Sequence, residues 1–407
     1  MARLPCRHRF DYRPRGPLWQ ARGAIMERMA ARRKTNRRQF LRGESALVAL
    51  GDVGSTREPW QGASGSAPPR VVVGENDAYL LEVGRRAMAC QFAVLLNAGQ
   101  HAGAADAALA ALDRVAAVEA QLSIFRPESE LCDVNRRGAT EEVPVDERLF
   151  ELLEHAVRLH ESTGGAFDIT AGPLSRVWGF TRREGRVPDR AELAGALALV
   201  GTHRLLLNGE RCTVRFGVSD MEINPGAIGK GYALDECTRL LVERGVADFI
   251  VHGGQSSVAA RGSRTSDGRG WKVGLRHPLR PQLRLAEVVL RNRALGTSGT
   301  AVQSFHYRGR KYGHIIDPRN GWPAEGTLSA TVITSSAADA DALSTALYAM
   351  GVPAALTWCA AHGDVSAVFV TPGQGAGTVE IHTANIDEDD WTWFDGAIGS
   401  EGDSIHD

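Results

Sequence analysis

From about residue 71, the chain alternates short apolar runs typical of strands with longer segments whose apolar residues recur at helical spacing. Residues 78–97 (AYLLEVGRRAMACQFAVLLN) predict two strands. Residues 102–123 (AGAADAALAALDRVAAVEAQLS) predict a helix, because strong helix formers fill the segment. A dinucleotide-binding Rossmann domain is marked by an early strand followed by G-x-G-x-x-G and a helix. This sequence contains no such unit. The pattern therefore predicts an α+β domain with mixed sheets and packed helices, not a Rossmann fold.

Further helices and strands follow along the chain. Asp146 is placed to cap a helix over 147–163, which ends at Gly164-Gly165, where glycine tolerates a left-handed backbone. A third helix is expected over 231–245, followed by a strand over 247–254. The C-terminal part predicts a strand, two helices and two more strands, over 328–335, 339–351, 353–363, 365–371 and 379–383.

The composition indicates a soluble globular protein. With 407 residues, 43% of them hydrophobic and 23% charged, the chain can bury a substantial core in one large domain or two smaller ones. The formal net charge of −1 gives no basic field that would indicate nucleic acid, and no run approaches the ~18 apolar residues of a membrane helix. The six cysteines form no C-x-x-C pair, which argues against a zinc site and a disulfide framework. We expect buried free thiols.

The two ends of the chain differ from the domain expected over 71–390. Region 1–70 is rich in arginine and then in Ser, Gly and Pro, and is expected to be disordered. Residues 35–43 (TNRRQFLRG) resemble a twin-arginine export signal, although the following segment offers only about five apolar residues against the ~7 to 15 expected. Export to the periplasm and a basic tail on a cytoplasmic protein both remain open. Residues 391–407 are expected to form an acidic tail.

Two glycine-rich segments carry residues suited to ligand binding. Segment 164–180 (GGAFDITAGPLSRVWGF) leaves a helix with Gly-Gly and exposes Phe167 and Asp168, although an ordinary connector would look similar. Segment 222–236 (EINPGAIGKGYALDE) has glycines that let the backbone approach a ligand, with Lys230 at the start of a helix. Free N–H groups and positive potential at a helix start favour anions, so this segment is either a phosphate-type site or a plain turn.

Segment 338–347 (ADADALSTAL) places Asp341 and Thr345 four residues apart on one helix face. A carboxylate, a hydroxyl and a backbone carbonyl would leave positions open for water and phosphate oxygens, as Mg²⁺ prefers. Alternatively, Asp339 or Asp341 only caps the helix.

His314 lies in segment 311–323 (KYGHIIDPRNGWP), which ends in a Pro, Asn and Gly turn over 317–321. Ile315 and Ile316 look like the end of a buried strand. The histidine is therefore either a polar residue at a strand end or a group that accepts a proton near neutral pH.

Four signature blocks and two further blocks resemble the ApbE family, the FAD:protein FMN transferases, over roughly residues 80 to 385. They are GGAFDITAGPL, GAIGKGYALD, HIIDPRNG, ADADALSTAL, LSIFRPESELCDVN and GTSGTA. The resemblance implies an FAD-binding cleft in which Mg²⁺ holds the diphosphate. It also implies an acceptor protein with a Thr or Ser hydroxyl, typically a membrane redox subunit.

The resemblance assigns roles to particular residues. His314 would be the general base that takes the proton of the acceptor hydroxyl as its oxygen attacks the phosphorus of FMN and AMP leaves. The metal ligands would be Asp341, Thr345 and the carbonyl of Ala227. The residues at positions that contact FAD would be Met88, Phe125, Ala166, Phe167, Asp168, Asn224, Lys230 and Ile315.

Some positions depart from the family pattern. Asn224 and Gln255 stand where the family usually has Asp, Ala89-Cys90 replaces Gly-Thr, and Phe125 replaces a frequent Tyr. None of these changes removes a metal ligand or His314, so an active enzyme is expected. The alternatives are a Mg²⁺-dependent FAD pyrophosphatase, which releases FMN and AMP, and a non-catalytic FAD-binding protein.

Overall fold

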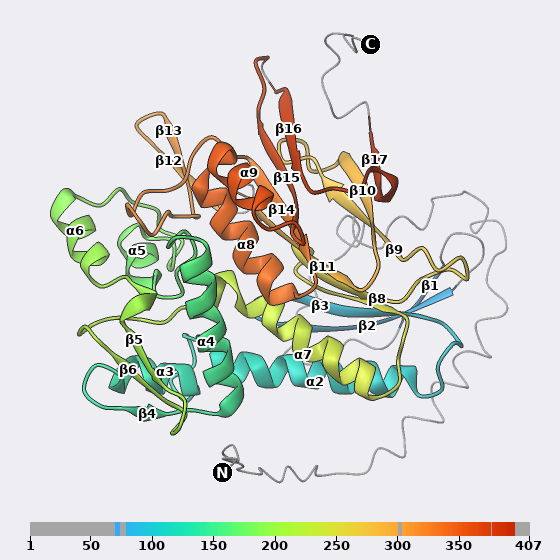
Figure 1. Cartoon of the computed structure of the whole chain (residues 1–407), viewed down its shortest axis with the longest axis horizontal. Coiled ribbons are helices and arrows are strands. Elements are labelled where there is room, and N and C mark those ends of the chain that lie inside the picture. Colours follow the sequence, from blue (N-terminus) through green and yellow to red (C-terminus); the bar gives the residue numbers. More distant parts are fainter. Residues whose placement is uncertain (1–69, 74–78, 300–302, 376, 395–407) are drawn as a thin grey trace.

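The computed structural model describes residues 70–73, 79–299, 303–375 and 377–394 of the chain (Figure 1). The twin-arginine-like segment and the basic region before residue 70 lie outside the described residues, as does the tail beyond residue 394.

One large antiparallel sheet forms the centre of the molecule (Figure 1). Its strands, in spatial order, are β1 (Arg70–Val73), β2 (Tyr79–Ala87), β3 (Cys90–Asn97), β7 (Phe249–Gly253), β8 (Ser257–Arg261), β11 (Arg293–Gly299), β14 (Ser329–Thr334), β15 (Ser366–Pro372) and β16 (Val379–Ala384). The two strands expected over 78–97 are β2 and β3. The turn between them consists of Met88 and Ala89, both with positive φ, as the tight turns that suit twisted hairpins require.

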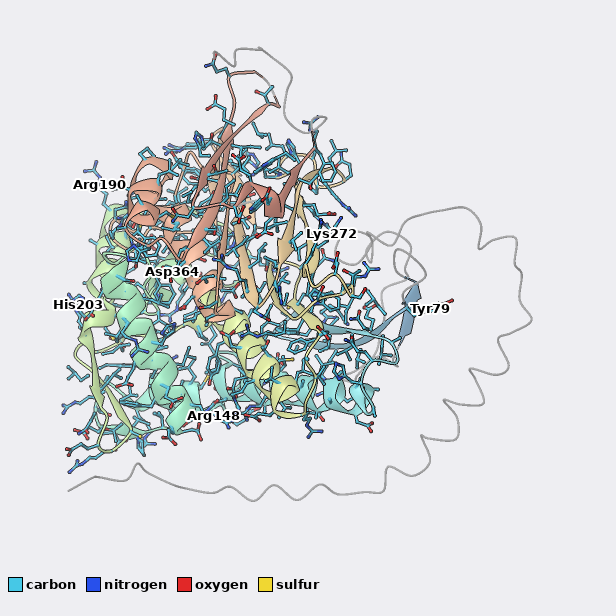
Figure 2. All side chains as sticks on the ribbon, turned by 45° about the vertical axis from the view of Figure 1, so that its right-hand side comes forward. Tyr79, Arg148, Arg190, His203, Lys272 and Asp364 are labelled. Carbon is cyan, nitrogen blue, oxygen red and sulfur yellow. The ribbon has the colours of Figure 1, made fainter. Side chains whose placement is uncertain are left out.

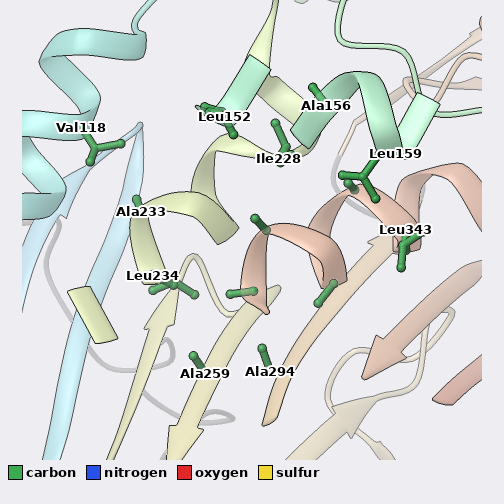
Figure 3. Close-up of a cluster of buried hydrophobic side chains, with 14 of the residues drawn as sticks. Val118, Leu152, Ala156, Leu159, Ile228, Ala233, Leu234, Ala259, Ala294 and Leu343 are labelled. Carbon is green, nitrogen blue, oxygen red and sulfur yellow. The ribbon is translucent and has the colours of Figure 1, made fainter. Parts of the chain in front are cut away.

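Helices cover one face of this sheet (Figure 1). They are α2 (Ala104–Leu122), α7 (Gly229–Glu243), α8 (Ala337–Met350) and α9 (Val352–Ala360), while α4 (Glu147–Ser162) packs against α8. Figure 3 shows part of the core between them, where Leu234 of α7 and Leu343 of α8 lie with Ala259 of β8 and Ala294 of β11. Small alanines here let the helices lie close to the strands.

A second sheet packs on the opposite face of the large sheet. It consists of β9 (Trp271–Arg276), β10 (Arg284–Leu290) and β17 (Trp391–Trp393), in the order β17-β10-β9. Trp391 is buried in a core shared with Ile250 and Val258 of the large sheet. The segment expected to be a tail from residue 391 therefore begins with a strand, because burying Trp391 and pairing with β10 outweighs the acidic character of the following residues.

Smaller elements complete the fold. They are α3 (Glu130–Arg137), β4 (Val143–Pro144), α5 (Gly172–Val177), α6 (Arg190–Ala198), η5 (Thr202–Arg204), β5 (Leu205–Asn208), β6 (Thr213–Phe216), η6 (Pro225–Ala227), β12 (Ser304–Tyr307), β13 (Arg310–Gly313) and η7 (Glu388–Asp390). Among the described strands, β12 and β13 pair with each other alone and form a separate hairpin. In Figure 2, the exposed Arg190 of α6 lies at the left of the molecule, and the exposed Tyr79 of β2 lies at the right.

The local predictions agree with these elements. Asp146 caps α4 by accepting a hydrogen bond from the Arg148 N–H at 3.0 Å, and Gly164 and Gly165 after the helix both have positive φ. The exception is the end of a buried strand expected at Ile315 and Ile316. Both residues follow β13 without continuing it, and Ile316 makes an isolated bridge to Pro323.

The cysteines are free thiols where the structure describes them, and Cys237 and Cys359 are buried. None of the helices in the described part of the chain has the length and apolarity that a membrane crossing requires.

Candidate active site

A cavity of about 410 Å³ lies where the four predicted segments meet. The predicted residues that line it are Ala166, Phe167, Asp168, Asn224, Ala227, Lys230, His314, Ile315, Asp341 and Thr345. Ser256 and residues 297–299 complete the polar part of the wall. The fold therefore brings into one site segments whose separation along the sequence reaches about half the length of the chain.

Met88 and Phe125 do not line this cavity. The Phe125 ring is 75% exposed in the connection after α2, and Met88 is half-buried against the main core. The turn that carries Met88 nevertheless lies close to the polar end of the site. Burial raises the pKa of the neighbouring Cys90 thiol to about 11, and the charges of Lys230 and Asp341 also act on it.

Helices α7 and α8 cap each other. The Asp341 carboxylate of α8 accepts a hydrogen bond from the Gly231 N–H of α7 at 2.8 Å. The Asp235 carboxylate of α7 accepts hydrogen bonds from the N–H groups of Ala337 and Ala338, each at 2.9 Å. The free N–H groups in the first turn of each helix thus find a carboxylate from the other helix. Asp341 does not cap its own helix, whose N-cap is Ser336.

Two glycines permit this close crossing. A Cβ at Gly231 would lie 2.0 Å from the carbonyl oxygen of Ala337, and a Cβ at Gly296 would lie 2.4 Å from that of Ala340. Gly231 therefore serves helix packing and not the close ligand approach expected for it. Gly226, by contrast, lines the cavity.

Asp341 is the centre of a polar network. Its side chain is 5% exposed and pairs with the Lys230 ammonium at 3.2 Å. The Ser257 hydroxyl donates to Asp341 at 2.6 Å and accepts a hydrogen bond from Lys230 at 2.9 Å. Thr345 donates to the Asp341 carbonyl at 3.2 Å, and its hydroxyl lies 2.9 Å from that of Ser298. Ser257 was not predicted, because no local pattern distinguishes it from other serines.

A backbone carbonyl orients the ring of His314. The Nδ1 atom lies 3.1 Å from the carbonyl oxygen of Gln303, and the His314 backbone N–H donates to the same oxygen at 3.3 Å. A carbonyl can only accept, so Nδ1 carries the hydrogen, and Nε2 of the neutral ring keeps its lone pair. Burial lowers the pKa of His314 and outweighs the opposite effect of the Gln303 carbonyl. The ring is therefore largely neutral near pH 7.

Gln303 is held in turn by Phe180, whose carbonyl accepts a hydrogen bond from the Gln303 side chain at 2.8 Å. The Phe180 ring also meets the His314 ring edge-on at 6.5 Å. Asp317, the acidic neighbour of His314 in the sequence, pairs instead with Arg319 at 2.8 Å and closes the predicted turn. Sequence reasoning missed Gln303, since the contact uses its main chain.

Asp168 uses its carboxylate to hold the segment over 164–172 in place. The side chain is 2% exposed, accepts hydrogen bonds from Thr170 and Thr202, and lies 3.3 Å from Nδ1 of His160. Burial alone would raise the pKa of Asp168, but these contacts outweigh it and keep the pKa below its ordinary value. Asp168 in turn raises the pKa of His160. The carboxylate therefore shapes the wall formed by Ala166 and Phe167.

Asn224 has a similar local role. Its side-chain oxygen accepts a hydrogen bond from the Gly226 N–H at 3.0 Å, and its own N–H donates to the Ile169 carbonyl at 2.7 Å. The amide therefore supports the turn before α7 without the charge of an aspartate.

The geometry defines a class of protein. The Lys230 ammonium lines the cavity and can contact phosphate groups, and a neutral histidine in the same cavity can accept a proton. A family model, the ApbE family, matches residues 88–369, which is more than half of the chain. The chain belongs to the ApbE family.

Related sequences and structures agree with this assignment. The chain is 30% identical to an FAD:protein FMN transferase of Klebsiella pneumoniae (strain 342) over 252 residues, which cover 61% of this chain and 77% of the relative. It is 31% identical to one of Treponema pallidum (strain Nichols) over 268 residues, 62% of this chain and 74% of the relative.

Two solved structures share the fold. An ApbE protein from Thermotoga maritima has a TM-score of 0.66 and 28% identity, with 74% of this chain and 96% of that chain covered. The apo flavinyl transferase ApbE of Pseudomonas stutzeri has a TM-score of 0.66 and 27% identity, with 77% and 95% covered. The predicted family and the predicted α+β fold are confirmed.

Proposed function

We propose that this protein transfers FMN from FAD to a Ser or Thr hydroxyl of an acceptor protein and releases AMP. The observation that carries the proposal is that one cavity holds both the Lys230–Asp341 pair and His314 with its Nε2 lone pair available. The names of the relatives, FAD:protein FMN transferases, support the same reaction.

The reaction needs one nucleophile, one base and one leaving group. The acceptor hydroxyl oxygen attacks the phosphorus of the FMN half of FAD, and the bond from this phosphorus to the bridging oxygen breaks. AMP leaves with the bridging oxygen, and the hydroxyl proton goes to Nε2 of His314. The Lys230 ammonium offsets negative charge on the phosphates as the bond breaks. No atom changes its oxidation state.

The residues in the cavity fit Mg²⁺. Asp341, Thr345 and Ala227 line one cavity and offer a carboxylate, a hydroxyl and a backbone carbonyl, all hard oxygen donors. No group of three or more His, Cys, Asp or Glu side chains that could hold a metal occurs in the described part of the chain, so a metal here would depend on the hydroxyl and the backbone carbonyl beside the one carboxylate. When bound, Mg²⁺ would neutralise phosphate charge.

The decisive experiment incubates the protein with FAD, Mg²⁺ and a protein extract from cells that lack this enzyme. Covalent FMN on an acceptor protein is then sought by mass spectrometry, and free FMN and AMP are measured beside it. Release of FMN and AMP without any adduct would indicate FAD hydrolysis instead, and intact FAD would indicate a binding protein.

We further propose that the enzyme is exported through the segment TNRRQFLRG and modifies a membrane redox subunit. Replacing both Arg37 and Arg38 by Lys should then retain the protein in the cytoplasm, because the export pathway reads the arginine pair. Cell fractionation measures this, and an unchanged distribution would favour a basic tail.

A further inference from the structure

His160 connects the end of α4 to the wall of the active-site cavity. Its side chain lies in the last turn of the helix and is 16% exposed. The ring atom Nδ1 lies 3.0 Å from the carbonyl oxygen of Phe167 and 3.3 Å from a carboxylate oxygen of Asp168. A carbonyl can only accept, so Nδ1 carries the hydrogen that faces both oxygens. Phe167 and Asp168 line the cavity, whereas His160 does not.

The end of α4 holds Phe167 by both of its backbone polar groups. The Thr163 hydroxyl accepts a hydrogen bond from the Phe167 N–H at 3.1 Å, while the ring of His160 faces the Phe167 carbonyl. The side chains of Ala166 and Phe167 pack into the main core with almost no exposed surface. A shift of this backbone would therefore move the cavity wall and disturb the core beneath it.

Asp168 adds an electrostatic reason for a charged His160. Its carboxylate is 2% exposed and accepts hydrogen bonds from the neutral groups of Thr170 and Thr202. Among the described residues, its one ion pair is with His160. A buried carboxylate without a nearby cation is costly, and FAD brings the negative charge of its diphosphate into the same cavity. Binding of FAD should therefore be tighter while the charge of Asp168 is balanced.

Asp168 dominates the surroundings of the His160 ring. The hydrogen bond with Asp168 raises the pKa of His160, and this effect outweighs burial, which lowers it. The other charged or titratable groups around the ring are Glu161 of α4, the exposed His203 of η5 with its ring 6.0 Å away, and Arg319, which lies beside Gly165 and pairs with Asp317. The ring therefore carries a charge below a pKa that lies above the ordinary ~6.5 and loses it as the pH rises further.

We propose that His160 is a positioning residue for FAD, whose charged ring holds Asp168 and the Phe167 carbonyl so that the wall over 166–168 keeps the shape that FAD binds. This inference rests on the proposed function in taking FAD as the ligand of the cavity. FAD affinity should then fall as the pH rises and the ring loses its charge. By reciprocity, FAD should raise the proton affinity of His160, so that the protein takes up protons when FAD binds.

The test measures FAD affinity by calorimetry from pH 7 to 9, with Mg²⁺ and without an acceptor. In this range His314 is already neutral, because its pKa is lowered, and the Cys90 thiol, with a pKa of about 11, remains protonated. His160→Asn keeps an N–H donor but cannot carry a charge. His203→Asn is the matched control, because His203 is exposed and its side chain makes no hydrogen bond among the described residues.

We expect the dissociation constant for FAD to rise about threefold from pH 7 to 9 in the wild type and in His203→Asn, since a charge-assisted hydrogen bond is roughly twice as strong as a neutral one. His160→Asn should show the weaker, high-pH affinity at every pH. Its turnover at saturating FAD should equal that of the wild type, because His160 does not line the cavity. Calorimetry of the wild type at pH 7.5 in two buffers of different ionisation enthalpy should show proton uptake on FAD binding.

A wild-type affinity that is constant from pH 7 to 9, or FAD binding without proton uptake, overturns this role of His160. The same follows if His160→Asn keeps the pH dependence of the wild type, or if His203→Asn loses it. If His160→Asn does not fold, proton uptake by the wild type and by His203→Asn decides. A wild-type protein that binds FAD with this pH dependence but forms no adduct in the protein extract overturns the proposed transfer and leaves the role of His160 intact.

Discussion

His160 and His314 show how the immediate neighbour of a side chain sets its protonation. Asp168 raises the pKa of His160, so this ring tends to carry a charge that pairs with the carboxylate. His314 faces a neutral carbonyl in a buried position, and its pKa is lowered. The first histidine is suited to an ion pair that holds a loop, and the second is suited to accept a proton.

This difference predicts the pH dependence of turnover. The neutral form of His314 is the base, so activity should rise as the pH passes the lowered pKa, below the ordinary ~6.5, and be flat at neutral pH. His314→Ala should lose about 10²- to 10⁴-fold in rate, or about 3 to 5 kcal/mol of barrier, while FAD affinity is retained. Steady-state rates from pH 5 to 8 measure this. A folded His314→Ala variant with the parental rate would exclude the histidine as the base.

Asp341 has two roles that substitution can separate. Asp341→Asn keeps one oxygen, which can still accept the Gly231 N–H, but it loses the charge and places an amide N–H group toward the Ser257 hydroxyl. We expect it to melt close to the wild type and to lose the Mg²⁺-dependent part of FAD binding. Asp341→Ala should lose both the Mg²⁺-dependent part of FAD binding and stability. The stability falls because an unpaired buried N–H costs about 1 to 3 kcal/mol. Calorimetry measures FAD affinity with Mg²⁺ and with a chelator, and thermal unfolding measures stability. If the wild type binds FAD equally well with Mg²⁺ and with a chelator, a metal role is refuted.

At the scale of elements, the site depends on how closely α8 lies against α7 and β11. Gly231 and Gly296 leave room for the backbone in the first turns of α8. These turns carry Asp341, the centre of the polar network. The glycines thus act on function through packing, because they set the distance at which the Asp341 carboxylate reaches α7.

Gly231→Ala should therefore destabilise the protein. Its Cβ would lie 2.0 Å from a backbone oxygen that cannot rotate away, and overpacking of this kind costs about 1 to 3 kcal/mol or more. Gly195→Ala is the control, since a Cβ there meets nothing within 4 Å and alanine stabilises a helix by about 1 kcal/mol relative to glycine at this exposed position of α6. Urea unfolding of both variants gives the comparison. If the two variants have equal free energies of unfolding, α7 and α8 can move apart without a loss of stability.

At the scale of the whole molecule, the large sheet separates two cores. One lies under the helices and contains the site wall, and the other lies under the three-stranded sheet. Strand β17 contributes to the second core although its pairing partner lies far away in the sequence. Trp391 of β17 pairs with Val288 of β10.

Truncation tests the contribution of β17. A chain that stops after residue 390 loses Trp391, and the loss of a buried tryptophan costs about 3 to 5 kcal/mol. A chain that stops after residue 394 retains β17 and should melt near the full-length value. If both truncated chains melt at the same temperature, β17 does not stabilise the second core.

The sequence by itself determined the features that depend on neighbouring residues. The helix over 102–123 and the cap at Asp146 followed from propensity and short-range hydrogen bonding, which act within a few residues. The ordered blocks determined the family and, with it, the α+β fold. They also named most of the residues that line the cavity, because those residues lie inside the blocks.

Only the tertiary structure decided which groups meet. Ser257 and Lys230 reach Asp341 across more than 80 residues of sequence, and the carbonyl of Gln303 sets the tautomer of His314 across a hairpin. The same holds for Met88 and Phe125, which were expected to contact FAD but do not line the cavity. The physical reason is that these contacts depend on strand pairing and helix crossing, and residue type alone carries no information about the distance between two segments once the chain has folded.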